Sequence, residues 1–403
     1  MSVKAPNLIK LIDVSIVQQM LEDHGRYLNG RSGRRANFSY TDLANMSLEG
    51  VDLSDAEMTG TRLNGAILTG AKLDRAVLFG CDLRDADLRR ASLIKADLRG
   101  ACLRGANLAQ ADLSGCDLRE GLIALQDLTS GFRILKHEKK AGELSYAVLS
   151  GATLQGAQMG GALAASTDFS DADMTGAVLS SARLNNAILD GADLSGAQLH
   201  QTDLSGASLR RAIMNGAELG GATLDDGALD DTLKAPAPIF YIDDQPLHEV
   251  IALHEEWCTS DGEKGTAARM NAVDFRSIKR LAGRKLTALS APNSIFFGMD
   301  LRRAHLQGAD LSGADLRTAD LREADLRGAK LVGAQLVRAK LAGANFGPLP
   351  IMEGRVVRTD LSRASLRYAD LSDCDLRRAR MLEADMAGAF LEGADLTDAE
   401  LEA

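Results

Sequence analysis

The sequence predicts an all-β solenoid, and three regularities between residues 86 and 118 carry the prediction. Leucine recurs at every fifth position, at Leu88, Leu93, Leu98, Leu103, Leu108, Leu113 and Leu118. A small residue, Ala or Cys, stands two positions before each leucine, and the residue between them is usually polar and most often Asp. A period of five matches neither the 3.6 residues of a helical turn nor the 2 of a strand. Each repeat therefore indicates a short strand followed by a two-residue bend, with the small residue and Leu facing inward.

This pattern resembles the pentapeptide-repeat family, and three long runs of the chain carry it. The resemblance implies what the spacing does not show: four pentads form one square coil, and the coils stack into a right-handed quadrilateral β-helix. The interior would then be lined by ladders of Leu and of the small residue. Backbone pairing between coils would set the rise at about 4.8 Å per coil. We expect short α-helical modules to cap such solenoids.

Residues 1–35 do not follow the period, and we expect them to form an N-terminal helical cap. Ser15 and Gln18 match a capping box, which predicts a helix from about Ser15 to Leu28. The apolar stripe of that helix is Ile16, Val17, Met20 and Leu21. Because an open coil presents unpaired backbone groups, this helix is expected to cover the first coil.

The first two runs occupy residues 36–120 and 142–233. The last centre of run one, Leu118, is followed by the first centre of run two, Leu144, and the step between them is not a multiple of five. The break between the runs is therefore real, and residues 121–141 are expected to form a protruding loop or hairpin. Within it, residues 132–135 resemble a strand and residues 137–142 resemble a turn.

Residues 234–299 are expected to form a second helical module that resembles the first. Asp244 is a candidate cap for a helix through about Cys258. Both modules contain His-x-x-aromatic, as His24 to Tyr27 and as His254 to Trp257. After a two-residue insertion, Gly33, Ala36, Asp42 and Leu43 match Gly265, Ala268, Asp274 and Phe275. We infer a duplicated unit that consists of a helix followed by a solenoid.

Run three occupies residues 300–403. Residues 347–358 contain Pro348 and Pro350 and keep the five-residue step, so they are either a degenerate coil or a loop of fitting length. The last coil has no cap of its own, which makes a homodimer through this uncapped C-terminal coil a hypothesis. Whether runs two and three stack coaxially or form separate rods is left open by the sequence.

Composition excludes several function classes. The 403 residues include 46 Lys and Arg against 56 Asp and Glu, a net charge of −10. This balance argues against direct binding of nucleic acid or of an anionic membrane, which would need a basic face. No apolar stretch approaches a membrane span. Lys10 and Asp13 interrupt the only N-terminal apolar segment, so a secretory signal is not expected and the predicted location is cytoplasmic.

The sequence shows no catalytic, cofactor or metal site, and we do not expect an enzyme. Cys81, Cys116 and Cys374 stand at small-residue positions, and no CxxC occurs. The recurring Asp residues are the solvated outer positions of the pentads. There is no phosphate-binding loop and no GxSxG. His24 and His254 are expected to have a structural role, packing on Tyr27 or Trp257, and ligand binding is the alternative.

The function expected from these observations is a non-enzymatic protein–protein interaction scaffold whose partner and pathway the sequence does not name. The contact residues are expected in the two non-repeat pieces, at Phe132, Arg133, His137, Lys139, His254 and Trp257.

The alternative is a DNA mimic that binds, inhibits or protects a type II topoisomerase, as the quinolone-resistance and gyrase-inhibiting members of the family are thought to do. Residues 141–233 contain 3 basic and 12 acidic residues, and the proposed acidic face is Asp193, Asp203, Glu218, Asp225 and Asp230. In run one, by contrast, Arg84, Arg89, Arg99, Arg104 and Arg119 offset the nearby acids.

Overall fold

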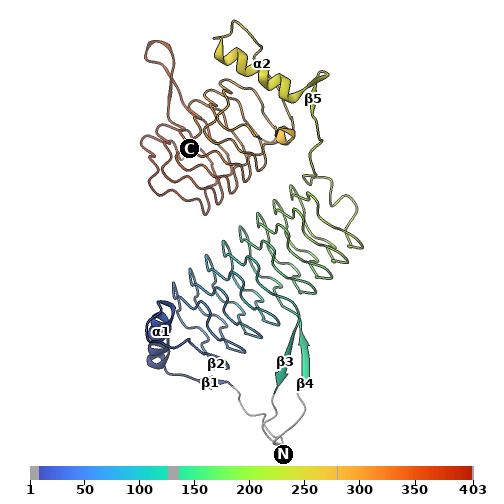
Figure 1. Ribbon diagram of the computed structural model, residues 1–403, viewed down its shortest axis with the longest axis vertical. Coiled ribbons are helices and arrows are strands. Elements are labelled where there is room, and N and C mark those ends of the chain that lie inside the picture. The colour runs from blue at the N-terminus through green and yellow to red at the C-terminus, as the bar shows by residue number, and fades with distance from the viewer. Residues whose placement is uncertain (1–8, 126–135, 279, 402–403) are drawn as a thin grey trace, which may run out of the picture. The chain divides into compact units, whose positions relative to one another are not determined.

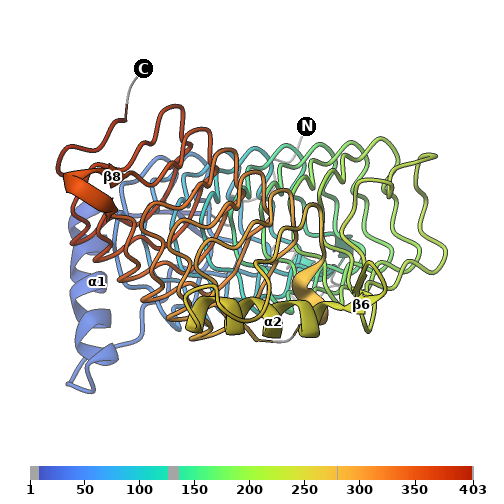
Figure 2. The same cartoon turned by 90° about the horizontal axis from the view of Figure 1, so that it is seen from above.

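The chain forms two compact units, Met1–Ala235 and Pro236–Ala403, each of which is a stack of coils preceded by one helix (Figure 1). The computed structural model describes residues 9–125, 136–278 and 280–401. Figure 2 shows the coils of each unit from above as a series of stacked loops.

Each pentad pairs with the pentad one coil further along the chain through a parallel bridge. Asp82 pairs with Cys102 and Asp87 with Asn107, so paired positions are four pentads apart. Because one coil contains four pentads, it has four sides, and four ladders of bridges run along the stack. The chain is therefore a β-helical solenoid. Most bridges involve a single residue, which is why long strands are few among the described residues.

The local structure of one pentad explains the period. The Leu88 N–H donates to the Asn107 carbonyl of the next coil (2.7 Å), and the Asn107 N–H donates to the Ala86 carbonyl (2.9 Å). Between pentads, the Ala91 N–H donates to the Leu88 carbonyl (3.0 Å) and closes a four-residue turn. The third turn residue, Arg90, has φ 58°, a conformation that Gly adopts most readily. Gly is therefore frequent at these corners.

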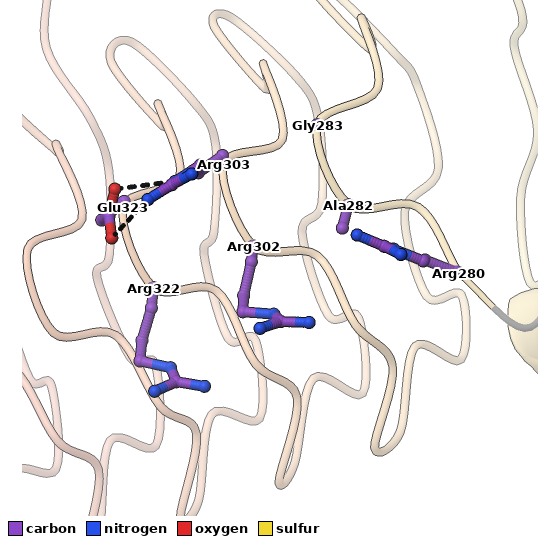
Figure 3. Close-up of a pocket in the computed structure, with 7 residues that line it drawn as sticks. All are labelled: Arg280, Ala282, Gly283, Arg302, Arg303, Arg322 and Glu323. Carbon is purple, nitrogen blue, oxygen red and sulfur yellow. Dashed lines mark hydrogen bonds and ion pairs between the residues drawn. The ribbon is translucent and has the colours of Figure 1, made fainter.

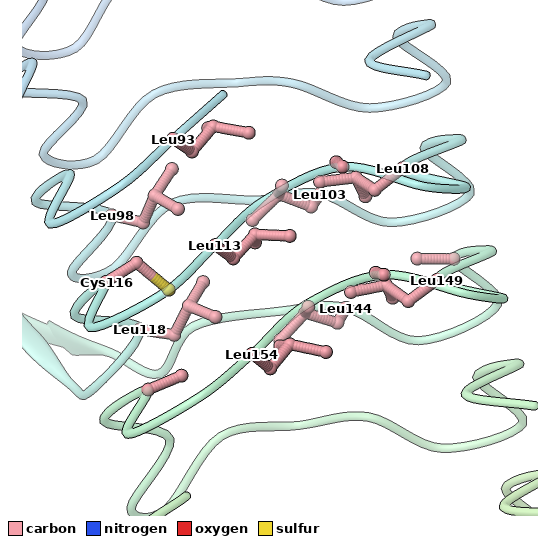
Figure 4. Packing of buried hydrophobic residues seen from close by; sticks show 14 of the residues in the cluster. Leu93, Leu98, Leu103, Leu108, Leu113, Cys116, Leu118, Leu144, Leu149 and Leu154 are labelled. Atoms are coloured by element: carbon pink, nitrogen blue, oxygen red, sulfur yellow. The ribbon is translucent and has the colours of Figure 1, made fainter. Parts of the chain in front are cut away.

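The core consists of the predicted ladders of Leu and Ala (Figure 4). Leu93, Leu98 and Leu103 are completely buried, as are the small residues beside them. A few small positions hold Thr, and several of these hydroxyls donate to the carbonyl of a centre residue in the preceding coil. These bonds join Thr61 to Phe38 (2.8 Å), Thr167 to Leu144 (2.8 Å) and Thr202 to Leu179 (2.9 Å). A polar residue is thus accommodated because its hydrogen bond is satisfied.

Runs one and two form one continuous stack with an insertion looped out of it. Cys102 pairs with Glu143, a position well beyond the regular step of four pentads, so the additional chain is added to one coil. Strand β3 (Gly121–Leu125) pairs antiparallel with strand β4 (Lys136–Lys140) inside that insertion. The sequence predicts a turn at residues 137–142, and this prediction is wrong for residues 137–140, which belong to strand β4. Residues 126–135 lie outside the described part of the chain.

Helix α1 (Val14–Leu28) precedes the first coil and packs on it. Val17 and His24 are buried, and Met20 and Leu21 are partly buried against the core of the first unit. The N-cap is Asp13, whose carboxylate accepts the Ser15 N–H, so the capping box expected from Ser15 is wrong by two residues. Strand β1 (Lys10–Leu11) pairs in parallel with β2 (Thr41–Asp42), adding one more rung to a ladder.

Helix α2 (Leu247–Thr259) holds the corresponding place in the second unit, and it buries Leu247, Ile251 and His254. It follows the short antiparallel pair β5 (Tyr241–Ile242) and β6 (Gln245–Pro246). Its N-cap is Pro246 without a side-chain hydrogen bond, so the cap expected from Asp244 is not formed.

The coils of the second unit begin well before the boundary expected at residue 300. Arg269 already pairs with Ser290, and Asp274 pairs with Ile295. A six-residue step from Asp274 to Arg280 breaks the period in the sequence, although both residues are bridge positions in the structure. The 3₁₀ helix η1 (Phe275–Ser277) lies at this step.

Residues 347–358 contain a loop rather than a degenerate coil. Lys330 pairs with Asp360, two pentads beyond the regular step, so a length of chain equal to two pentads is looped out. Strand β7 (Leu349–Pro350) pairs antiparallel with β8 (Val356–Val357), and the 3₁₀ helix η2 (Met352–Gly354) lies between them.

Candidate functional site

The two helical modules share one buried histidine clamp. His24 Nδ1 accepts the Ala36 N–H (3.1 Å), and its ring stacks on Tyr27 at 5.8 Å between centroids. His254 Nδ1 likewise accepts the Ala268 N–H (3.0 Å) and its ring stacks on Trp257 at 5.7 Å. The aromatic packing agrees with the structural role expected for these histidines, with a backbone N–H as the hydrogen-bond partner.

A glycine completes each clamp. A Cβ on Gly33 would overlap the Asp23 carbonyl and the Tyr27 nitrogen of α1, and one on Gly265 would overlap the Leu253 carbonyl and the Trp257 nitrogen of α2. The segment that follows each helix therefore crosses back over it at an equivalent point, at Gly33 on α1 and at Gly265 on α2. The sequence match of Gly33 with Gly265 corresponds to this shared close approach.

The contact of His254 with Cys258 does not make a nucleophilic pair. Cys258 Sγ lies 3.6 Å from His254 Nε2 and donates to the Thr287 carbonyl at 3.5 Å. Because Nδ1 accepts a backbone N–H, the neutral ring carries its proton on Nε2 and has no free lone pair to take the thiol proton. Burial also raises the pKa of Cys258 and lowers the pKa of His254.

Six contact residues are expected from the sequence, and the side chains of four of them lie outside the part of the chain that the structure describes. Phe132 and Arg133 lie outside the described residues, and His137 and Lys139 are described only as backbone positions of β4. His254 is completely buried, so its selection as a contact residue is wrong. Trp257 is half-buried against it.

The acidic residues of run two do not gather on one face. Asp193 belongs to the ladder of Asp173 and Ile213, and Asp203 to the ladder of Arg183 and Thr223. The remaining predicted residues are Glu218, on the ladder of Gln198, and Asp225 and Asp230, in the irregular stretch that follows the regular pentads. Three sides of the coil thus share these acids. Some also have partners, since the Asp225 carboxylate accepts the Gly206 N–H at 3.0 Å.

Four of the five Arg residues named in run one do offset Asp residues, through a repeated two-point contact, whereas Arg104 follows Cys102 and lies over the Tyr146 ring. In Asp-x-Arg pentads the Arg Nε and Nη2 bind the two carboxylate oxygens of the Asp two positions earlier. The pairs in run one are Asp82 with Arg84, Asp87 with Arg89, Asp97 with Arg99 and Asp117 with Arg119. Such forked contacts fix the guanidinium plane.

In the second unit the same contact occurs in adjacent coils and produces a row of arginines (Figure 3). Arg302 binds Asp300 at 2.8 and 2.9 Å, and Arg322 binds Asp320 at 2.8 and 2.6 Å. Arg280 stands one coil earlier on the same ladder, with its Nε 3.3 Å from Asp300. We call Arg280, Arg302 and Arg322 the arginine row. Sequence reasoning missed it because only the four-pentad coil brings these positions together.

The charges of the row are interleaved with carboxylates. Hydrogen bonding to Arg302 lowers the pKa of Asp300 to about 2, and hydrogen bonding to Arg322 lowers the pKa of Asp320. At the neighbouring corner, Arg303 binds Glu323 at 2.8 Å and lowers the pKa of that carboxyl. The acids therefore stay ionised and hold the guanidinium groups in place over the whole neutral pH range.

A second exposed feature is the β7–β8 hairpin, which sequence reasoning left undecided. Its exposed apolar side chains are Ile351, Met352 (81 % exposed), Val356 and Val357. A Cβ on Gly328 would meet both Leu349 and Val357, so the base of the hairpin packs closely on a coil corner. The exposed apolar residues Ile351 and Met352 therefore project from a hairpin whose first and last residues, Leu349 and Val357, pack on the solenoid.

The described residues contain neither a candidate metal site nor a candidate membrane-spanning helix. Among the residues that the structure describes, no group of three or more His, Cys, Asp and Glu side chains could hold a metal ion. Over the same residues, no helix combines the length and the apolar character needed to cross a bilayer.

The stacked coils define a β-solenoid repeat protein. The sequence of the repeats matches one protein family. The family model described as pentapeptide repeats (8 copies) matches residues 34–120, 143–226, 292–347 and 359–398. The matched residues are more than half of the chain, which therefore belongs to the pentapeptide-repeat family.

Several solved structures to which the chain is similar are pentapeptide-repeat or quinolone-resistance proteins. A trypsin-treated form of QnrB1, a plasmid-mediated fluoroquinolone resistance protein, is 18% identical over 48% of this chain and 88% of its own, with a TM-score of 0.25. HetL, involved in heterocyst differentiation regulation in Nostoc sp. strain PCC 7120, is 22% identical over 96% of both chains, with a TM-score of 0.13. The protein alr5209 from Nostoc PCC 7120 is 37% identical over 25% of this chain and 79% of its own, with a TM-score of 0.15. No curated protein matches the chain.

Proposed function

We propose that the chain is a non-enzymatic protein–protein interaction scaffold, in which rigid pentapeptide solenoids present short non-repeat hairpins to a protein partner. The observation that carries the proposal is the placement of the two insertions. Both insertions leave the coils before and after them in register, because Cys102 pairs with Glu143 and Lys330 with Asp360. The solenoid acts as a support, and the insertions supply surfaces that a repeated pattern lacks.

The chemistry of the described residues favours binding over catalysis. Catalysis needs titratable groups in contrasting environments around a shared cleft. Here many carboxylates are bound by Arg, by Ser or by backbone N–H groups, as at Asp300, Asp74 and Asp225, and the buried histidines are engaged in the two clamps. The helices α1 and α2 are proposed to act as end covers that keep the first coil of each unit from pairing with another chain.

The experiment is a capture of partners with register-matched deletion variants. Tagged full-length chain, a Δ121–141 variant and a Δ348–357 variant would be used to capture proteins from host lysate, followed by mass spectrometry. Each deletion restores a five-residue step between neighbouring centres, from Leu118 to Leu144 and from Phe346 to Leu361. We expect a partner that the full-length chain retains and that one of the deletions loses, with an unchanged circular dichroism spectrum. Partners held equally by all three proteins would contradict display by the hairpins.

The alternative function, DNA mimicry toward a type II topoisomerase, lacks the single acidic face that it requires. Asp193, Asp203 and Glu218 lie on three different ladders. A linear array of carboxylates that imitates a phosphate backbone needs its members on one side of the rod. Asn and Gln substitutions at these three positions are accordingly expected to leave partner capture unchanged.

A further inference from the structure

We propose that the arginine row of Arg280, Arg302 and Arg322 is a docking site for the carboxylate side chains of an acidic segment of a protein partner. The inference rests on the proposed scaffold function and deepens it, because it names one contact surface and the chemistry of what binds there. The row belongs entirely to the second unit.

The spacing of the row follows from the coil. Arg280, Asp300 and Asp320 are consecutive members of one bridge ladder, and Arg302 and Arg322 stand two residues after the two acids. Adjacent coils are separated by about 4.8 Å, the distance between paired strands. Figure 3 shows Arg302 and Arg322 side by side with their guanidinium groups pointing the same way, and Arg280 extending toward them from the opposite direction. A carboxylate can therefore accept from two neighbouring arginines at once.

The arginines are held in place and still have donors to offer. Arg302 and Arg322 use Nε and Nη2 to bind Asp300 and Asp320, and their Nη1 groups take no part in those bonds. Arg280 approaches Asp300 more loosely, with its Nε 3.3 Å from a carboxylate oxygen. The three side chains are 69%, 46% and 46% exposed. Because the acids already fix the guanidinium planes, little side-chain entropy is lost when a ligand binds.

A hollow beside the row leaves space for the ligand. In the coil of Arg280, the positions equivalent to Arg302 and Arg303 are Ala282 and Gly283, which leave a cavity of about 310 Å³ between these coils. The cavity is partly open to solvent, and Figure 3 shows the residues that line it. Small-molecule sites usually enclose most of their ligand, so an open hollow fits the edge of a larger partner.

Charge favours an acidic polypeptide over nucleic acid as that partner. Residues 269–346 contain 14 Lys and Arg against seven Asp and Glu, although the whole chain has a net charge of −10. This stretch is therefore the basic part of an acidic protein. Nucleic acid binding depends on several uncompensated phosphate contacts, whereas each arginine here already lies near a carboxylate. Planar carboxylates also match the fork of a guanidinium.

The test uses a fluorescent decaglutamate peptide and the full-length chain. The row variant carries Arg280→Gln, Arg302→Gln and Arg322→Gln. The matched control carries Arg84→Gln, Arg89→Gln and Arg119→Gln, which remove the same charge from arginines that follow Asp residues on three different ladders of the first unit. At low salt, about 50 mM, we expect the row variant to weaken peptide binding at least about tenfold and the control less than about twofold.

Equal weakening by both triple variants, or no measurable binding of the peptide to the parent chain, would overturn the proposal. Tighter binding of a duplex oligonucleotide through the same row would overturn the assignment to a polypeptide. If the row variant melts at a lower temperature than its parent, the single variant Arg280→Gln replaces it, because Arg280 makes the longer contact to Asp300. Loss of a captured partner on hairpin deletion, together with failure of the peptide test, would reject the row and leave the scaffold function standing.

Discussion

At the residue scale, the pentad separates two kinds of position by burial. The centre residue and the small residue before it face inward, and a substitution there acts through packing. Leu98 is completely buried within a ladder of other leucines. The neighbouring Asp97 faces outward, where Arg99 binds it through both carboxylate oxygens. A carboxylate is therefore expected to destabilise the fold at position 98, whereas at position 97 it is held by Arg99.

We expect Leu98→Asp to unfold the coils around it, because a carboxylate there has no partner in the Leu ladder. Truncation of a buried Leu to Ala typically costs about 2–5 kcal/mol, and a buried unpaired charge costs more. Thermal unfolding followed by circular dichroism measures the effect. Leu98→Met is the control, since a swap that preserves volume usually costs less than about 1.5 kcal/mol. Melting of Leu98→Asp at the parent temperature would show that the inward ladder is misassigned.

Two glycines near α1 give a matched pair of substitutions with opposite signs. Gly33→Ala is expected to destabilise the first module by about 1–3 kcal/mol, because its Cβ would overlap backbone atoms of the helix. Gly25→Ala is expected to stabilise it by about 0.5–1 kcal/mol, since Gly25 lies inside α1 and its Cβ would meet nothing. Chemical denaturation of both variants tests the pair. A Gly33→Ala variant as stable as Gly25→Ala would contradict the close approach.

The two clamps predict a loss of stability in mild acid. Burial lowers the pKa of both His24 and His254 below the ordinary value of 6.5. The unfolded chain therefore binds more protons than the folded chain, and stability decreases as the pH falls below about 6.5. Melts at about pH 8 and about pH 5 are compared for the parent and for a His24→Gln, His254→Gln variant. The variant should show the smaller difference, and an equal difference would assign the acid sensitivity to other groups.

At the element scale, the hairpins are insertions that the solenoid accommodates without a change of register. The chain leaves the stack after Glu120 and re-enters at Gly142, where a Cβ would overlap the Leu118 carbonyl. The sequence predicted the break, because the step from Leu118 to Leu144 is not a multiple of five. It did not predict β4, since Lys136–Lys140 has the composition of a turn and becomes a strand only by pairing with β3.

Register gives the deletion test a sharp control. Removal of residues 121–141 restores the five-residue step and is expected to leave the coils and their melting temperature nearly unchanged. Removal of residues 120–141 takes out one residue more, and a shift by one residue moves inward positions outward. Circular dichroism and thermal melts distinguish the two variants. Equal melting temperatures would mean that the ladder does not depend on register across this junction.

At the scale of the whole molecule, the last described coil offers a surface for association. Asp385, Phe390 and Asp395 pair with the preceding coil, and among the described residues no further coil pairs with them. Phe390 is 61% exposed. Unpaired strand edges with apolar side chains are templates for another chain, so the homodimer through this coil stays a prediction. Light scattering should report twice the mass of the 42.8 kDa chain, and Phe390→Asp should shift it toward the monomer. A monomeric parent at micromolar concentration would end the hypothesis.

The sequence by itself determined the solenoid, its inward ladders, the break after run one and the equivalence of the two helical modules. These follow from short-range rules, because the order of residues within a pentad decides which side chains face inward. The tertiary structure alone decided on which side of the coil each outward residue lies. That side depends on position within a coil of four pentads, and the insertion after run one or the six-residue step at η1 shifts it. For this reason the expected acidic face is divided among three ladders, and Arg280, Arg302 and Arg322 meet in one row.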